Sequence, residues 1–257
     1  MKILKLSENN YYLNSSILFF KSNFEKRKKF IDKKKFLFEE ISNFINNCID
    51  HSKNVFIFCA GNSIISKNIT SKKIYIKEIC EDYKINYNKN VDYINQINEA
   101  DLEDCDTVVV SDIEHQINPT SNLLTLSKLI NDDAKIVVLS KNIFWMILIK
   151  ILKYFFTFSP IKYNFLPSSY LENLFNSCNL EIIRNERIIA LPIYIPYITN
   201  LINKLFRLPI LNFFCVNNIT ILKKIKKNNS KNNNMKVSFI IPCKNEKDNI
   251  NLFEKEI

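Results

Sequence analysis

The stretch NVFIFCAGNS, residues 54–63, contains the only glycine in a chain of 257 residues. Its first part, 54–58, is a short apolar run of β-branched and aromatic residues, a pattern that predicts a strand. Gly61 comes directly after this run and predicts a tight turn. Because glycine accepts a positive φ and leaves the backbone open, such a turn can bring main-chain N–H groups close to a ligand.

Further strand and helix patterns alternate along the chain. Strand-like segments occur at 72–79, 91–97, 106–112, 134–140, 180–191 and 217–224. Helical patterns occur at 22–50, 119–132 and 168–179. The alternation predicts a mostly parallel sheet with helices on both faces, and 106–112 has the continuous apolar character of a strand buried on both sides. We therefore predict an α/β, doubly wound, Rossmann-like fold with a seven-stranded sheet; 180–191 is either one long strand or a strand pair.

The chain divides into unequal parts. Residues 1–225 hold all of these elements, with a core at about 50–224, and an apolar, proline-punctuated insert at 192–214 precedes the last strand. Residues 226–235 are rich in Asn and Lys and are predicted to be a flexible linker. A new strand and helix start at 236–257, which is too short to form a domain and is predicted to be the incomplete beginning of one.

Composition excludes several classes of function. The net charge is +10, but the two basic runs at 25–35 and 223–231 fit a solvated helix face and a linker, and we expect no nucleic-acid partner. The seven cysteines show no paired spacing and there are two histidines, so we expect neither a disulfide framework nor a metal site. The N-terminus does not resemble a signal peptide, and these features together predict a cytoplasmic protein.

Polar residues follow the predicted strands where a parallel sheet binds its ligands, at the carboxyl ends of the strands. Glu78 ends the second strand and is placed to accept both hydroxyls of a ribose. Asp101, in the acidic loop that also holds Glu103 and Asp104, is placed to accept an adenine amino group. The chain has no phosphate-binding glycine motif. The predicted ligand is therefore a nucleoside without a pyrophosphate.

The segments VFIFCAGNS, IYIKEI, CDTVVVSDIEH and INDDAKIVVLSKN, together with the late helix and strand in 163–192, resemble class I S-adenosylmethionine (SAM)-dependent methyltransferases over residues 23–224. The resemblance implies SAM as the cofactor. The residues that it places against SAM are Cys59, Ala60, Gly61, Asn62, Ser63, Glu78, Ile79, Asp101 and Leu102.

The glycine motif departs from that of the family. Cys59 and Ser63 stand at two of its usual small positions, and Ile57 stands where the family has an acid. Loss of a charged hydrogen bond costs about 1.5–3 kcal/mol, which weakens cofactor binding without abolishing it.

Methyl transfer requires alignment of the acceptor and, for some acceptors, a base. His115 is the candidate base, with a packed structural histidine as the alternative. Asp112 is either a contact to ligand or acceptor or an anchor of its loop. We predict no catalytic metal.

The C-terminal segment VSFIIPCKNEKDNI resembles the opening of family-2 glycosyltransferases through Pro242, Asn245 and Glu246. This resemblance implies a bifunctional methyltransferase–glycosyltransferase cut at the start of its second part, so no glycosyl transfer is expected from this chain. We predict a SAM-dependent methyltransferase for a small-molecule or glycan/lipid-linked acceptor. The alternative is a catalytically degenerate methyltransferase fold that serves as an interaction or membrane-docking module.

The insert 192–214 is either a capping subdomain or a surface for an apolar acceptor. Lys204 and Arg207 within it fit an anionic lipid headgroup, which would place the protein peripherally on the inner face of a membrane. The sequence leaves the oligomeric state open.

Overall fold

The computed structural model describes residues 17–51, 53–84, 90–94, 102, 104–116, 118–152 and 166–225. All of them belong to the first of two compact units, Met1–Ile225. The predicted linker at 226–235 and the predicted domain start at 236–257 lie outside the described residues.

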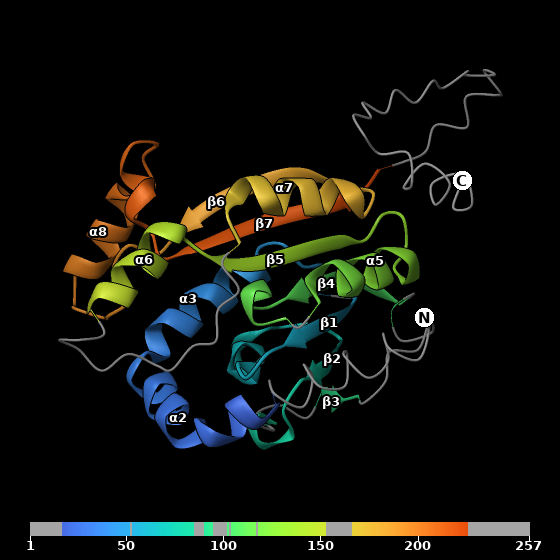
Figure 1. Ribbon diagram of the computed structural model, residues 1–257, viewed down its shortest axis with the longest axis horizontal. Coiled ribbons are helices and arrows are strands. Elements are labelled where there is room, and N and C mark those ends of the chain that lie inside the picture. Colours follow the sequence, from blue (N-terminus) through green and yellow to red (C-terminus); the bar gives the residue numbers. More distant parts are fainter. Residues whose placement is uncertain are drawn as a thin grey trace, which may run out of the picture. The chain divides into compact units, whose positions relative to one another are not determined.

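A seven-stranded sheet with the order β3-β2-β1-β4-β5-β7-β6 forms the centre of the molecule (Figure 1). Its strands are β1 Asn54–Cys59, β2 Lys73–Glu78, β3 Val91–Tyr93, β4 Cys105–Val110, β5 Lys135–Lys141, β6 Leu180–Ile188 and β7 Asn217–Lys224. The strands from β3 to β5 are parallel, and β7 is antiparallel to both β5 and β6. The prediction of a seven-stranded, mostly parallel α/β sheet is confirmed.

Helices cover both faces of the sheet. The α-helices are α2 Phe24–Lys33, α3 Lys35–Asn46, α5 Pro119–Leu129, α6 Ile143–Leu152, α7 Ser168–Ser177 and α8 Ile198–Leu205. Short 3₁₀ helices are η1 Ser63–Asn68, η2 Glu81–Tyr83, η3 Ile113–His115 and η4 Leu211–Phe214. One core packs α3 and η1 against one face, and a second core packs α5 and α7 against the other. Strand β1 contributes side chains to both cores, because Ile57 belongs to the first and Phe56 to the second. A strand buried on both faces is apolar without alternation.

The prediction of one helix over 22–50 is wrong, because the helix breaks at Lys34. Helix α3 presents Leu37, Phe38, Ile41 and Ile45 to the core. Helix α2 is mostly charged and buries little beyond Arg27 and Ile31. Because of this break, the axis of α2 is free to differ from that of α3, which is set by packing against the core.

Smaller differences concern the ends of elements. Strand β3 covers only 91–93 of the predicted 91–97, and 95–97 lie outside the described residues. The segment 180–191 forms one strand, β6, rather than a pair. The turn after β1 continues into the 3₁₀ helix η1. Asn118 caps α5 by accepting a 2.9 Å hydrogen bond from the N–H of Ser121, as the Pro at the start of that helix leads one to expect.

The insert before β7 is fastened to the end of β5 by Asn142. Its Nδ2 atom donates hydrogen bonds to the carbonyls of Phe213 at 2.6 Å and Cys215 at 2.8 Å. Trp145 of α6 adds a 2.6 Å bond from Nε1 to the carbonyl of Phe214. These bonds hold α6 and η4 together, and α8 lies beside them at the same end of the sheet (Figure 1).

Candidate functional site

The glycine turn follows β1 at the carboxyl edge of the parallel strands. Gly61 has a φ of +71°, in the left-handed region that only glycine enters without steric cost. A Cβ atom at this position would lie 3.0 Å from Cε1 of Phe20 and 3.1 Å from Nε of Arg27. The turn therefore requires glycine both for its backbone conformation and for its packing.

Glu78, the last residue of β2, binds the same turn. Its Oε1 atom accepts hydrogen bonds from the N–H groups of Gly61 at 2.6 Å and Ile79 at 2.9 Å. Burial raises the pKa of Glu78 to about 7, against the opposing effects of the Gly61 hydrogen bond and of Arg27. Its buried Oε2 atom has no hydrogen-bond partner among the described residues. Of the two oxygens predicted to face a ribose, Oε1 is used within the protein, and a ribose contact of Oε2 stays a prediction.

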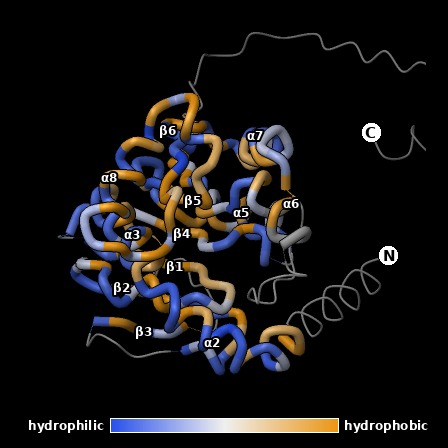
Figure 2. Tube along the Cα trace, turned by 90° about the vertical axis from the view of Figure 1, so that its left-hand side faces the viewer, coloured by the Kyte–Doolittle hydropathy of each residue, from blue (hydrophilic) through white to orange (hydrophobic). Residues whose placement is uncertain are grey.

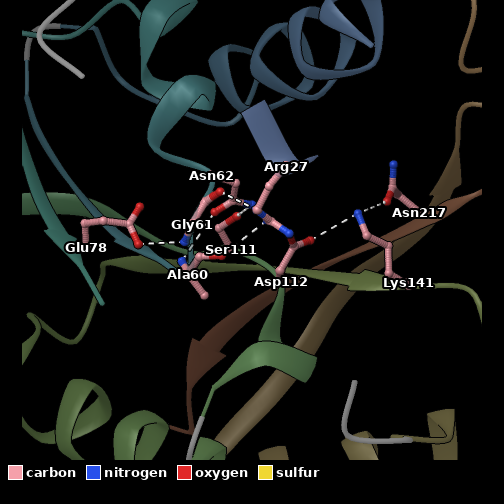
Figure 3. A network of polar contacts seen from close by, with 9 residues as sticks. All are labelled: Arg27, Ala60, Gly61, Asn62, Glu78, Ser111, Asp112, Lys141 and Asn217. Atoms are coloured by element: carbon pink, nitrogen blue, oxygen red, sulfur yellow. Dashed lines mark hydrogen bonds and ion pairs between the residues drawn. The ribbon is translucent and has the colours of Figure 1, made fainter. Parts of the chain in front are cut away.

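Arg27 of α2 lies across the turn (Figure 3). Its Nε atom donates a 2.7 Å hydrogen bond to the carbonyl of Gly61, and Nη2 donates a 3.3 Å bond to the carbonyl of Ala60. Nη2 also lies 3.7 Å from Oδ2 of Asp112. The prediction of a solvated basic face at 25–35 is wrong for Arg27, which is buried because these acceptors compensate its desolvation.

Asp112 follows β4 and is the centre of a buried polar network (Figure 3). It accepts a 2.9 Å hydrogen bond from Nδ2 of Asn62 and pairs with Nζ of Lys141 at 3.1 Å. Burial acts to raise the pKa of Asp112, but its electrostatic interactions with Lys141, His115 and Arg27 bring it below its ordinary value. These contacts give the ionised Asp112 the role of a loop anchor, and a contact to an acceptor stays a prediction.

Lys141 connects the ends of three strands. Its Nζ atom donates a 2.8 Å hydrogen bond to Oδ1 of Asn217, at the start of β7, besides its pair with Asp112. Its backbone N–H donates to the carboxyl group of Glu114. Burial and the nearby charge of Asp112 raise the pKa of Glu114 to about 8, so this side chain is largely protonated at neutral pH.

Aromatic side chains cover the turn. The ring of Phe20 is buried, with its centroid 5.9 Å from the ring of Tyr83 and 5.7 Å from that of His115. The hydroxyl of Tyr83 donates a 2.9 Å hydrogen bond to the carbonyl of Phe20. His115, the predicted base, is thus buried beneath Phe20, and its role as a base stays a prediction.

The remaining turn residues predicted to contact the cofactor are all buried: Cys59, Ala60, Asn62 and Ser63. The Oγ atom of Ser63 donates a 2.5 Å hydrogen bond to the carbonyl of Tyr83. Burial raises the pKa of the Cys59 thiol well above its ordinary value, which makes this cysteine a poor nucleophile. The small residues allow the turn to pack closely.

The predicted adenine-binding loop is only partly described. Leu102 is fully buried in the core that α5 covers. Asp101 and Glu103 lie outside the described residues, and Asp104 is exposed. The assignment of Asp101 and Leu102 to cofactor binding stays a prediction.

Several residues of the site were not predicted from the sequence, and Phe20, Arg27 and Lys141 are the ones that contact the turn or Asp112 most directly. Lys141 ends an apolar strand, as Glu78 does, so the rule that located Glu78 also applies to it. Phe20 and Arg27 precede β1 in helical segments whose pattern says nothing of a site. Only the tertiary fold brings them to Gly61.

The donor and acceptor groups fit the sugar of an adenosyl group. A buried, unpartnered Oε2 atom on Glu78 lies beside a turn that has no side chain at Gly61. The guanidinium of Arg27 is a cation suited to a carboxylate such as that of methionine. In the described part of the chain, no three His, Cys, Asp or Glu side chains are grouped to hold a metal ion.

No protein-family model matches the sequence, and no curated protein matches it. Solved structures do. A SAM-dependent methyltransferase from Thermotoga maritima is similar with a TM-score of 0.59 and 11% identity, over 81% of this chain and 99% of that one. Magnesium protoporphyrin IX methyltransferase from Synechocystis PCC 6803, solved with bound S-adenosylhomocysteine (SAH), is similar with a TM-score of 0.52 and 11% identity, over 83% and 99% of the two chains.

This chain has the class I SAM-dependent methyltransferase fold. The strand order and the antiparallel β7 are those typical of that fold. At such low identity the likeness establishes the fold, and it identifies neither substrate nor activity.

Proposed function

We propose that the chain is a SAM-dependent methyltransferase that binds its cofactor at the carboxyl ends of β1, β2 and β4. The observation that carries the proposal is the pair formed by Glu78 and Gly61. Buried carboxylate oxygens without a hydrogen-bond partner occur on Glu78, Asp106 and Glu114 among the described residues, and their desolvation is uncompensated. Only that of Glu78 belongs to a carboxyl group bound to the Gly61 turn. A ribose hydroxyl donated to Oε2 of Glu78 would satisfy it.

The chain's own residues then take distinct roles. Gly61 and Glu78 hold the sugar, and Arg27 is the cation available for the methionine carboxylate. Asp112 stays ionised and keeps the end of β4 in place through Lys141. His115 is the candidate base for an acceptor that must lose a proton. A bound SAM would supply an electrophilic methyl group that needs little further activation.

Cofactor binding requires a local rearrangement. Phe20 and Arg27 lie within 3.1 Å of the position that a Gly61 side chain would take, so they occupy the space next to the turn. Both belong to the helical segments that precede β1. We expect these segments to shift when the cofactor enters, and we expect Arg27 to exchange a backbone carbonyl for the incoming carboxylate.

The same packing favours a second candidate, a degenerate fold that no longer binds SAM. If Phe20 and Arg27 fill the site permanently, the buried network is a structural substitute for the cofactor. Ile57 in place of the family's acid points in this direction. In that case the chain acts as an interaction or docking module.

The proposed class of methyl acceptor rests on the resemblance of the C-terminal segment to another enzyme family. The segment 236–257, which is similar to the start of family-2 glycosyltransferases, supports a glycan or lipid-linked acceptor and a bifunctional architecture. A small-molecule acceptor is the alternative. Both use the same cofactor site.

Calorimetric titration with SAM and SAH tests the proposal. We expect binding that tightens roughly fivefold between about pH 6 and pH 8, because ionised Glu78 is a stronger acceptor than the neutral acid. Glu78→Gln should weaken binding and remove this pH dependence. Glu81→Gln, an exposed residue of η2, is the matched control and should behave like the parent. An absence of binding by both ligands would favour the degenerate module.

A further inference from the structure

Helix α8 has its polar and apolar faces inverted. Thr199 and Asn203 are buried, whereas Ile198, Leu201 and Leu205 face the solvent. Leu201 exposes 69% of its surface. In a helix of a globular protein the apolar stripe normally faces the core, so this outward stripe requires an explanation.

The buried polar residues fix this orientation. Thr199 Oγ1 accepts a 2.7 Å hydrogen bond from the N–H of Ile195 and donates a 2.7 Å bond to the carbonyl of Ile193. Asn203 Oδ1 accepts bonds from the N–H groups of Ala190 at 3.0 Å and Leu191 at 2.9 Å. Turning the apolar stripe inward would break all four bonds and leave part-buried backbone groups without these partners.

Exposed apolar residues before and after α8 extend the stripe into a surface, which we name the docking face: Tyr194, Tyr197, Ile198, Leu201, Leu208 and Ile210. Tyr197 exposes 93% and Ile210 87% of their surfaces. Tyr197 also holds a φ of +62°, which is rare for a bulky residue and directs its ring into the solvent. Figure 2 shows that hydrophobic and hydrophilic residues alternate along the chain around α8.

The surroundings of the docking face carry an excess of positive charge. Between residues 187 and 225 the sequence has no Asp or Glu. One cavity between β6 and the η4 region is lined by Arg184, Arg187, Arg207 and one acid, Glu186, which pairs with Arg184. Arg187 and Arg207, together with the exposed Lys204 of α8, therefore give this region its net positive charge. An apolar surface with tyrosines and a basic rim is the combination that binds the interface of an anionic bilayer.

We propose that the docking face binds the surface of a membrane that contains anionic phospholipids. A second copy of the chain fits less well, because pairing two such faces would bring like charges together. Within the described ranges, every helix is too short or too polar to cross a bilayer, so the contact is interfacial. This inference does not rest on SAM binding, and it holds for an active methyltransferase and for a docking module.

The docking face is joined to the carboxyl edge of the sheet. Asn142, which follows Lys141 of the buried network, binds the carbonyls of Phe213 and Cys215. A membrane bound at this face would therefore lie beside the edge where β5 ends. That placement suits an acceptor whose lipid part remains in the bilayer.

Co-sedimentation of the full chain with vesicles tests the proposal. We expect binding to phosphatidylcholine vesicles that contain about one third phosphatidylglycerol, and much weaker binding to phosphatidylcholine alone. Leu201→Asp and Ile210→Asp should each lower the partition coefficient at least about tenfold. Each variant places a charge where the proposed bound state has an apolar side chain in contact with the bilayer. Lys204→Ala with Arg207→Ala should lower binding by roughly fivefold per charge, on anionic vesicles only.

Ile225→Asp is the matched control, since Ile225 is exposed and follows the opposite end of β7. The basic run at 223–231 keeps its charges in the docking-face variants, whereas Ile225→Asp lowers its net charge by one, so this control also measures what that run contributes to binding. Equal loss of binding in Ile225→Asp and Leu201→Asp, or no binding to anionic vesicles, would overturn the proposal. A dimer in light scattering that Leu201→Asp dissociates, without vesicle binding, would assign the face to self-association instead.

Discussion

The Nε atom of Arg27 donates a 2.7 Å hydrogen bond to the carbonyl oxygen of Gly61, 34 residues further along the chain. This bond joins the helices that precede the sheet to the turn on which the proposed cofactor site depends. A buried guanidinium is stable there because two carbonyls and Asp112 replace its water. Any ligand that enters beside Gly61 must therefore compete with a contact that the protein already makes.

Phe20→Ala tests whether the Phe20 ring, which lies next to Gly61 together with Arg27, is a movable cover of the proposed site. Removal of the buried ring should lower the free energy of unfolding by about 3 kcal/mol. The same change should tighten SAM binding, because the ring no longer occupies the space over Gly61. Chemical denaturation and calorimetry measure the two effects. Leu18→Ala, an exposed neighbour, should change neither, and a loss of SAM affinity in Phe20→Ala would show that the ring is part of the binding site.

Gly61→Ala tests the requirement for glycine. The left-handed backbone costs a residue with a Cβ about 1–2 kcal/mol, and contacts with Phe20 and Arg27 should bring the total loss of stability to about 2–4 kcal/mol. Asn179→Ala provides the comparison, because Asn179 is exposed and also has a positive φ, of 57°. If thermal unfolding showed equal losses in the two variants, close packing at Gly61 would contribute nothing.

Glu78→Gln tests the elevated pKa of this buried carboxyl group. In the folded protein the pKa is about 7, above its ordinary value of 4.5. The folded state therefore holds the proton more tightly than the unfolded state, and the associated stability is present below about pH 4.5 and is lost as the pH rises through about 7. The loss should be on the order of 3 kcal/mol.

Urea unfolding between about pH 4.5 and pH 8 measures this effect as the difference between the parent and Glu78→Gln. The difference cancels the similar contribution of Glu114, whose pKa is also raised. A constant difference across this range would mean that Glu78 is already ionised in the folded protein at low pH.

Asp112 and Lys141 should show strong energetic coupling. Lys141→Met leaves a buried carboxylate with less compensation and should cost about 2–3 kcal/mol. Asp112→Asn keeps a residue type that tolerates the positive φ of this position, and the double variant should be less damaged than the sum by about 1–3 kcal/mol. The exposed pair Lys73 and Asp92, with N and O atoms 2.6 Å apart, is the control and should couple by less than about 1 kcal/mol. Equal coupling in both pairs would show that burial does not strengthen the inner one.

The sequence predicted most of the sheet. Strand β4 is continuous and apolar in the sequence because both its faces are buried, and that pattern is local. The position of Glu78 was predictable for a similar reason, because a residue that ends a parallel strand reaches the edge where ligands bind. The hydrogen bond between Glu78 and Gly61 joins two such positions.

Hydrophobic periodicity did not predict the role of a residue whose partner lies far away in the sequence. Arg27 stands in a run of basic residues, and nothing in that run distinguishes it from its solvated neighbours. No proline or glycine lies near Lys34 to predict the break in the helix there. Both follow from packing: α3 lies against the sheet, and α2 leaves it where buried carbonyls and Asp112 accept a guanidinium.

Local pattern thus sufficed for the strands, their order of appearance and the acid and glycine at their tips, since strand formation and burial depend on neighbouring residues. The cover of Phe20 and Arg27, the single free oxygen of Glu78 and the outward apolar stripe of α8 arise only in the folded chain. Each depends on hydrogen bonds or contacts outside the local helix or strand pattern, and the free energy of such contacts is set by burial, which that pattern does not record.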